Sequence, residues 1–386
     1  MSTRAPTGSG RSRGLIYRFD KTTLFWPHGT GRRRPVRRAL LLGCLSLVLS
    51  SAACFLLRPE LPSRSFRSMG GRATVTLGTA YSDRIEPVTA QVHTILARLE
   101  WELSTYRPDS AISLLAERAA VAPLAVSEEA FRVLSLGKHF GELSDGAFDI
   151  TVAPLVRHWG VGRTPEPAGL LSEETIREQL RLVDYRRLVL ADRTAFLPAK
   201  GMGVDLGGIA KGYAVDLAFD FCRGAGIEDF LIDLSGNIRV SGRPQWGEDW
   251  QIGVRNPFDR SRIIGKVTLE SGMALATSGS YERFVEIAGQ RYSHIIDPRT
   301  GYPVTGTAGV TVLCQGATAA DGLSTSFFVV GLKGAGKLLQ KTPSAEVLIV
   351  PDKYPLEIWL TPGFAKAFVP IPELAKAVRL LGPDSP

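Results

Sequence analysis

Residues 204–216 read VDLGGIAKGYAVD, a strand-like segment that runs into two glycines and then into a helix beginning near Ala210. Glycines placed before a helix let backbone N–H groups approach a phosphate closely. The segment lacks the GK[ST] ending of a Walker loop, and GMGVDL departs from GxGxxG at Leu206. Because Lys211 lies on the first turn of the expected helix, this stretch predicts a phosphate or pyrophosphate site, with a purely structural glycine pair as the alternative.

The segments around this stretch alternate between strands and helices. Strand candidates bounded by Gly, Pro or Asp read FLIDL, WQIGV, IIGKVTL, ERFVEIAG, GVTVLC, EVLIV and LEIWL. Ser127 and Ser172, each followed by two glutamates, predict helix starts, and RLVL and TAFLP predict a hairpin around Asp192 and Arg193. Because roughly five or more helices accompany the strands, we expect a single mixed α/β (α+β) domain over residues 73–386, which could form two lobes, rather than a β-sandwich.

The formal net charge of +8 is concentrated at the N-terminus. Residues 1–38 hold ten Lys or Arg and one acid, Asp20, which leaves 36 basic and 37 acidic residues in the rest of the chain, a net charge of about −1. Nucleic-acid binding needs positive charge distributed over the binding surface. The charge distribution therefore excludes a nucleic-acid-binding protein.

An uncharged apolar segment, ALLLGCLSLVLSSAACFLL, spans residues 39–57. As a helix it would be about 28 Å long, close to the thickness of a bilayer's hydrocarbon core. Since positive charge precedes it, we expect residues 1–38 to be a basic, disordered cytoplasmic tail and the large domain to lie on the periplasmic or extracytoplasmic side of the inner (cytoplasmic) membrane. Residues 39–57 would be a retained signal anchor or a signal peptide cleaved before a lipidated Cys54, and residues 58–72 a linker.

A second motif, DGLSTSFFVVG (residues 321–331), is expected to form a helix after the strand GVTVLC. Asp321 and Thr325 are four residues apart, so their oxygens project from one face of the helix toward the same point. A carboxylate and a hydroxyl suit a hard cation such as Mg²⁺, which keeps several waters and contacts substrate phosphates. An Asp and a Thr at this spacing also occur by coincidence, so a purely structural pair stays open.

The segment RYSHIIDPRTGYPV carries a strand into the turn DPRTG. His294 is the one histidine embedded in a polar, turn-bounded segment, which is typical of a general base; a histidine that only bonds the turn backbone is the alternative. In other polar clusters Tyr106 offers an aromatic face for a planar ring, and Asp109 or Ser110, and Asp149, are suited to cap helices. Together the motifs predict an exported domain that binds a phosphorylated ligand with Mg²⁺.

Eight segments within residues 74–331 follow one another in a characteristic order: LGTAY, STYRPDSAIS, GAFDITVAPLVRHWG, DLGGIAKGYAVD, LIDLSGNIRVSG, ATSGSYERF, RYSHIIDPRTGYPV and ADGLSTSFFVVG. This series resembles the ApbE family, the FAD:protein FMN transferases. The resemblance implies an exported, Mg²⁺-dependent enzyme that splits FAD, releases AMP and attaches FMN through a phosphodiester to a Thr or Ser hydroxyl of an acceptor protein. The acceptors it implies are membrane-bound redox subunits.

The resemblance also implies roles for individual residues. It places Tyr106 against the flavin, and it makes His294 the base that deprotonates the incoming hydroxyl. The residues implied to bind FAD are Leu77, Tyr106, Ala147, Phe148, Asp149, Asp205, Lys211 and Ile296. Those implied to hold Mg²⁺ are the side chains of Asp321 and Thr325 and the main-chain carbonyl of Gly208.

Two positions depart from the family pattern. Leu77 stands where Met is usual, which keeps an apolar contact but loses the thioether, so we expect a modest effect. Ser235 stands where the first Gly of a GGD or GGN segment is usual, with Gly236 and Asn237 kept. The backbone conformation at Ser235 is therefore open to question.

The same residues leave two alternatives. An FAD pyrophosphatase would use the same site with water as the nucleophile and would release free FMN and AMP. A non-catalytic, membrane-anchored flavin-binding protein would only store FAD, although storage does not need Asp321, Thr325 and His294. The acceptor is not encoded in this sequence, because the nucleophile would lie on another chain.

Overall fold

The computed structural model describes residues 60–160, 172–244, 248–281, 284–287 and 290–382. The expected cytoplasmic tail, residues 1–38, and the expected membrane segment, residues 39–57, lie outside this part of the chain. Among the residues that are described, no helix combines the length and the apolar character needed to cross a membrane. Residues 60–386 cluster as one unit, which contains the whole described fold.

A nine-stranded sheet lies at the centre, in the order β1-β2-β6-β7-β10-β13-β14-β15-β17. All neighbouring strands are antiparallel except β15 and β17. Their bounds are β1 Ser63–Ser68, β2 Gly71–Leu77, β6 Phe230–Leu234, β7 Asn237–Ser241, β10 Met273–Gly279, β13 Thr307–Gln315, β14 Glu346–Pro351, β15 Ile358–Leu360 and β17 Val378–Leu380. The expected strands FLIDL, GVTVLC and EVLIV lie in β6, β13 and β14, and the mixed α/β architecture is confirmed.

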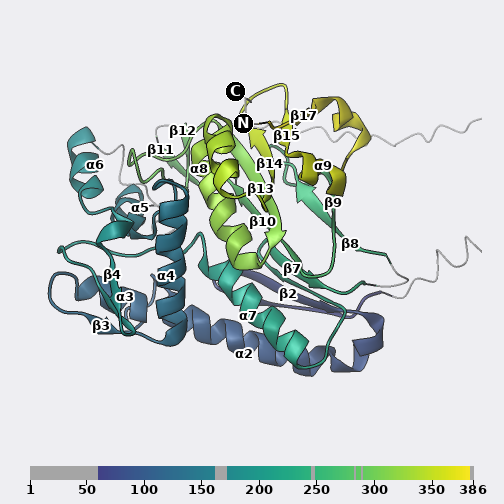
Figure 1. The fold of residues 1–386 in the computed structure, drawn as a ribbon, viewed down its shortest axis with the longest axis horizontal. Coiled ribbons are helices and arrows are strands. Elements are labelled where there is room, and N and C mark those ends of the chain that lie inside the picture. Colours follow the sequence, from purple (N-terminus) through teal and green to yellow (C-terminus); the bar gives the residue numbers. More distant parts are fainter. Residues whose placement is uncertain (1–59, 161–171, 245–247, 282–283, 288–289, 383–386) are drawn as a thin grey trace, which may run out of the picture. The chain divides into compact units, whose positions relative to one another are not determined.

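Helices cover one face of this sheet (Figure 1). The largest are α2 (Ile85–Leu103), α4 (Glu128–Leu143), α7 (Ala210–Gly224) and α8 (Ala317–Lys341). Successive strand residues face opposite sides, so Ala274 and Ala276 of β10 share a core with α7 and α8, whereas Leu275 faces the other way. α8 packs on β10 and β13, and α7 packs on β6 and β7. The sheet thus positions both helices that carry the predicted phosphate and metal motifs.

A smaller sheet packs on the opposite face of the central sheet. It consists of β8 (Trp250–Arg255), β9 (Ile263–Leu269) and β16 (Phe368–Pro370), with α9 (Pro362–Ala367) beside it. Its apolar residues, such as Val267 and Phe368, share a second core with Leu275 and Leu348 of the large sheet.

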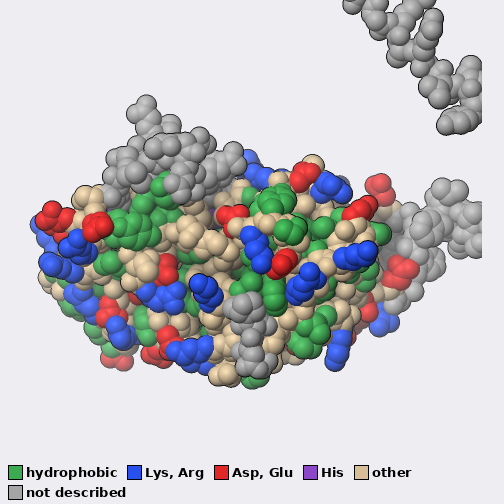
Figure 2. Space-filling model, turned by 90° about the horizontal axis from the view of Figure 1, so that it is seen from above, with side chains coloured by type: hydrophobic (Ala, Val, Ile, Leu, Met, Phe, Trp, Pro, Cys, Tyr) green, Lys and Arg blue, Asp and Glu red, His purple; other side chains and the backbone are tan. Residues whose placement is uncertain are grey.

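Figure 2 shows one face of the molecule, on which Lys and Arg side chains are mixed with Asp and Glu.

The remaining elements of the described chain are short. The helices are α3 Ala111–Glu117, α5 Ala153–Trp159, α6 Glu173–Leu180 and the 3-10 turns η1 Thr79–Arg84, η2 Ile150–Val152, η3 Tyr185–Arg187 and η4 Pro372–Ala377. The strands are β3 Leu124–Ala125, β4 Val189–Ala191, β5 Thr194–Phe196, β11 Phe284–Ile287 and β12 Gln290–Ser293. Ser127 and Ser172 cap α4 and α6 as predicted, and β4 and β5 form the predicted hairpin around Asp192 and Arg193.

Residues 63–72, part of the stretch expected to be a linker over residues 58–72, belong to the central sheet and its first turn. Ser63–Ser68 forms the edge strand β1, which pairs with β2 along its whole length. Phe66 packs against the main core, and the turn between the strands uses positive φ angles at Met69 (49°) and Gly70 (72°). Alternating Ser and Arg conceal this strand in the sequence, because an edge strand buries only one or two apolar residues.

The β6–β7 turn answers the question about Ser235. Ser235 has a φ of 54° and Gly236 a φ of 89°, so both lie in the left-handed region that favours glycine. The Ser235 hydroxyl accepts a hydrogen bond from the Arg72 backbone N–H at 3.1 Å. Serine therefore keeps the turn, and its hydroxyl bonds the neighbouring strand.

The close packing of α7 on α8 depends on Gly212. A Cβ atom at this position would lie 2.3 Å from the Ala317 carbonyl oxygen and 2.7 Å from the Asp321 Cβ. Gly212→Ala is therefore expected to lower the free energy of unfolding by ~3 kcal/mol. The matched control is Gly224→Ala at the end of the same helix, where nothing lies within 4 Å of the added Cβ. Urea unfolding measures both; equal stabilities would contradict the tight contact.

Candidate active site

The turn before α7 is held together by its own polar groups. The Asp205 carboxylate accepts a hydrogen bond from the Gly207 N–H at 2.8 Å, and the Lys211 ammonium donates to the Gly207 carbonyl at 2.8 Å. The Asp205 N–H donates to the Ile150 carbonyl at 2.7 Å, which ties the turn to η2. The Gly207 N–H, which was expected to face a phosphate, thus bonds within the turn. The Lys211 ammonium bonds the carbonyl of the same glycine.

Gly208 lies where three segments meet. A Cβ atom there would come within 2.9 Å of the Thr325 hydroxyl oxygen and 3.0 Å of the Phe148 ring, so only glycine fits without displacing them. Thr325 lies on α8 and Phe148 lies just before η2. The Thr325 hydroxyl is also 3.4 Å from the hydroxyl of Ser278 on β10. The structure therefore brings together Gly208, Thr325 and Phe148, which the sequence had linked only through the family resemblance.

Asp321 lies one helical turn before Thr325 on α8, as predicted, and is only 4% exposed. One carboxylate oxygen, Oδ2, accepts the Gly212 N–H at 2.9 Å. Within the described residues the other oxygen, Oδ1, accepts no hydrogen bond. Burial raises the pKa of Asp321, and the positive charge of Lys211 opposes this rise. A buried carboxylate with a spare oxygen is suited to contact a cation.

The donors around Gly208 fit Mg²⁺ by their chemistry. Asp321 offers a carboxylate oxygen, Thr325 a hydroxyl oxygen and Gly208 a main-chain carbonyl, and hard cations prefer oxygen ligands. In the part of the chain that the structure describes, no three His, Cys, Asp or Glu side chains gather into a metal-binding group. A cation here would thus have one carboxylate and would rely on water and on substrate oxygens for its remaining ligands.

His294 directly follows β12 and is half-buried. The segment behind it is firmly held: Ile296 forms a bridge with Pro303, and the Gly301 N–H donates to the Asp297 carbonyl at 2.8 Å. The indole N–H of Trp159 donates to the Gly301 carbonyl at 2.8 Å, which ties this DPRTG turn to α5. A rigid turn therefore holds the backbone next to the predicted base.

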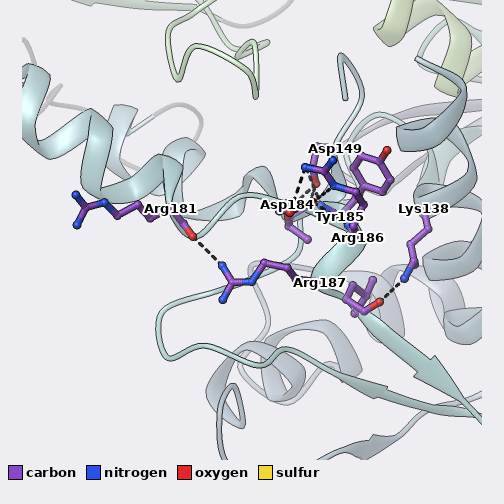
Figure 3. A network of polar contacts seen from close by, with 9 residues as sticks. Lys138, Asp149, Arg181, Asp184, Tyr185, Arg186 and Arg187 are labelled. Carbon is purple, nitrogen blue, oxygen red and sulfur yellow. Dashed lines mark hydrogen bonds and ion pairs between the residues drawn. The ribbon is translucent and has the colours of Figure 1, made fainter. Parts of the chain in front are cut away.

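Asp149, which the resemblance assigns to FAD binding, lies in a hydrogen-bond network between η2 and η3. One carboxylate oxygen accepts hydrogen bonds from the Thr151 N–H and hydroxyl at 2.7 and 2.6 Å, and the other accepts the Tyr185 N–H at 2.9 Å (Figure 3). Burial raises the pKa of Asp149. Both oxygens thus join η2 to η3, and the helix-cap interpretation of Asp149 is confirmed.

Asp149→Asn is expected to lower the free energy of unfolding by ~2 kcal/mol, because the new amide turns an N–H donor toward another donor. FAD affinity measured well below the melting temperature should change less than twofold. Thermal unfolding and fluorescence titration check the two parts. A large loss of FAD affinity in a variant of unchanged stability would instead make Asp149 a ligand-binding residue.

Four of the other predicted FAD-binding residues fall into two groups. Leu77, Ala147 and Ile296 are at most 5% exposed and pack in apolar cores or tight turns, so their side chains shape the fold around the site. Tyr106 is 60% exposed on the loop between α2 and α3, where an aromatic ring is accessible to a ligand.

A cavity of about 160 Å³ extends from Thr105, the neighbour of Tyr106 in the chain, to Asp205. Its lining comes from the α2–α3 loop, α3, α5 and the segment before α7: Thr105, Ile112, Ser113, Ala116, Ala153, Val156, Arg157, Val204 and Asp205. Arg157, which donates to the Gly201 carbonyl at 3.2 Å, is the cation of this lining and was not singled out from the sequence. Its segment, GAFDITVAPLVRHWG, contributes to the family resemblance, but Arg157 itself was given no role.

Comparison with known proteins decides the family. The family model described as "ApbE family" matches residues 69–349. The chain belongs to the ApbE family. An FAD:protein FMN transferase from Vibrio cholerae is 32% identical over 266 residues, covering 66% of this chain and 80% of that protein. The FAD:protein FMN transferase of Treponema pallidum is 32% identical over 309 residues, covering 73% and 84%.

A solved ApbE structure has the same fold. The crystal structure of the ApbE protein from Thermotoga maritima superposes with a TM-score of 0.73 at 30% sequence identity, covering 80% of this chain and 99% of that one. This ApbE-family chain is accordingly an enzyme of the transferase class.

Proposed function

We propose that this ApbE-family chain transfers FMN from FAD to a Thr or Ser hydroxyl of an acceptor protein and releases AMP. The observation that carries the proposal is the close contact of Gly208 with Thr325 and Phe148, which we call the cradle at Gly208. Here the Thr325 hydroxyl lies next to the turn that leads into Lys211. The buried carboxylate of Asp321 lies one helical turn away. The names of the two relatives, both FAD:protein FMN transferases, support the same reaction.

In the proposed reaction the acceptor hydroxyl oxygen attacks the phosphorus of the FMN half of FAD. A new phosphorus–oxygen bond forms, and the bond from this phosphorus to the bridging oxygen of the pyrophosphate breaks. AMP leaves with the bridging oxygen, and the hydroxyl proton passes to His294. Half-burial suits this role, because the ring is held in place and can still be reached by a hydroxyl from another chain.

The negative charge of the pyrophosphate must be neutralised as AMP leaves. Lys211 supplies one positive charge at the start of α7. Asp321, Thr325 and the Gly208 carbonyl would hold Mg²⁺. When bound, Mg²⁺ would withdraw charge from the phosphate oxygens and stabilise the leaving group.

We also propose that the enzyme acts on exported or membrane-bound redox proteins. Residues 39–57 would serve as the membrane segment, because they carry no charge and follow a strongly basic tail. Protease treatment of intact spheroplasts tests this location. Complete protection of the catalytic domain until the membrane is lysed would contradict it.

Mass spectrometry tests the reaction. The full-length chain is incubated with FAD and Mg²⁺, with and without a candidate acceptor, while AMP release is followed. We expect the acceptor to gain the mass of one FMN group in step with AMP release. AMP together with free FMN, and no adduct on a genuine acceptor, would favour the pyrophosphatase; FAD binding without AMP release would favour a storage protein.

A further inference from the structure

We infer that Asp216 is a positioning residue that sets the location of the metal ligands on α8. This inference rests on the proposed function, because it concerns the same site. Asp216 lies on α7, and it does not belong to the cradle around Gly208. It acts through α8, the helix that carries Asp321 and Thr325.

α8 has no cap of its own. Its N-cap residue, Gly316, has a φ of 84° and no side chain that could accept a hydrogen bond from the first turn. The first backbone N–H groups of a helix need an acceptor, and a carboxylate satisfies them best because of the helix dipole. Such an acceptor must therefore come from elsewhere in the fold.

Asp216 supplies this acceptor from the neighbouring helix. Its Oδ1 accepts the Ala317 N–H at 2.7 Å, and its Oδ2 accepts the Thr318 N–H at 2.9 Å and the Thr318 hydroxyl at 2.5 Å. These contacts join residues about a hundred positions apart in the chain. The carboxylate thus caps α8 across the helix–helix contact.

Arg239 on β7 holds the Asp216 carboxylate in place. The guanidinium and carboxylate are 2.9 Å apart, and their side chains are only 20% and 18% exposed. The same guanidinium stacks 3.8 Å from the centre of the Phe219 ring on α7. Its orientation is therefore fixed by the ion pair and the stacking together.

A second link joins the same two helices one turn further along α8. There the hydrogen bond runs from α7 to α8, because the Gly212 N–H donates to Asp321. Asp216 bonds the first turn of α8, and Asp321 bonds the first turn of α7. Sliding or rotation of α8 against α7 would therefore break both contacts. The cap at Asp216 thus fixes where Asp321 and Thr325 lie relative to Gly208.

The test is calorimetric titration of Mg²⁺ alone into the purified full-length chain. Asp216→Asn keeps the shape of the side chain but loses the charge and one acceptor. We expect its Mg²⁺ dissociation constant to rise about tenfold, the lower end of the range for losing a group that bonds a metal ligand directly, because Asp216 acts one step further away, through the helix. The matched control, Asp220→Asn, makes the same charge change on an exposed position of α7 and should bind Mg²⁺ like the wild type.

Steady-state kinetics separates positioning from general stability. The apparent KM for Mg²⁺ should rise about tenfold in Asp216→Asn, while kcat at saturating Mg²⁺ stays within about twofold. A role in stability alone would lower the melting temperature and leave Mg²⁺ affinity unchanged, which would overturn the inference. If Asp216→Asn does not fold, Thr318→Val removes only the hydroxyl donor, and an unchanged Mg²⁺ affinity there would equally overturn it.

The outcomes also separate this inference from the function on which it rests. Wild-type chain that binds no Mg²⁺ would overturn the proposed metal site and the inference together. Wild-type chain that binds Mg²⁺ and loses it on Asp321→Ala, beside an Asp216→Asn variant that binds normally, would overturn only the role of Asp216.

Discussion

Asp321→Ala is expected to abolish FMN transfer and with it the dependence on Mg²⁺. The variant loses the one carboxylate among the proposed Mg²⁺ ligands, and the Gly212 N–H loses its acceptor. We expect kcat/KM to fall about a thousandfold or more, the size associated with losing the main electrostatic stabilisation of a transition state. AMP release measured over a range of Mg²⁺ concentrations checks both parts of this expectation.

A control must show that the effect of Asp321→Ala is not a general weakening of α8. Ser326→Ala serves, because Ser326 is buried on the same helix and bonds only its own helix through the Gly322 carbonyl at 2.7 Å. We expect this variant to keep its Mg²⁺ dependence. Substantial Mg²⁺-dependent activity in Asp321→Ala would place the metal elsewhere in the chain.

His294→Ala is expected to bind FAD normally and to transfer FMN about a hundredfold more slowly, the size expected for losing a general base. Transfer slows because no side chain accepts the proton of the attacking hydroxyl, whereas the residues around Gly208 are untouched. Fluorescence titration of FAD and single-turnover transfer to an acceptor protein measure the two quantities separately.

The control for this variant is His139→Ala, which removes an exposed imidazole on α4. Its transfer rate should match the wild type. If His294→Ala also transfers FMN at the wild-type rate, His294 is a residue of the turn and not the base. A lower FAD affinity with an unchanged rate constant would instead make it a binding residue.

Local patterns predicted the parts of the site that lie on single helices. The spacing of Asp321 and Thr325 follows from helix geometry alone, and the structure has both on α8. The glycine and helix pattern around Lys211 likewise predicted where α7 begins, within a residue, although the expected strand at residues 204–206 is wrong because this stretch is irregular. Such patterns can be read from the sequence because each involves only residues that are close together in the chain.

Contacts between distant segments could not be predicted in this way. Asp149 was assigned to FAD binding by the resemblance alone, and no local pattern predicted that one of its oxygens bonds the Tyr185 N–H, in a different element. Leu77 was likewise assigned by the resemblance alone, and its complete burial in the main core depends on residues far away in the chain. Asp216 carried no prediction, because its partners lie on α8. A single sequence does not show which residues that are far apart in the chain contact one another in the fold.

The order of the strands has a consequence for how this chain folds. β2 and β6 are neighbours in the sheet, yet residues 78–229 separate them along the chain. Closing a loop of about 150 residues costs entropy before any pairing is gained, so we expect this half of the sheet to form late and slowly. The same arrangement makes the intervening helices an insertion between two adjacent strands. They could therefore lengthen or shorten during evolution and leave the strand order unchanged.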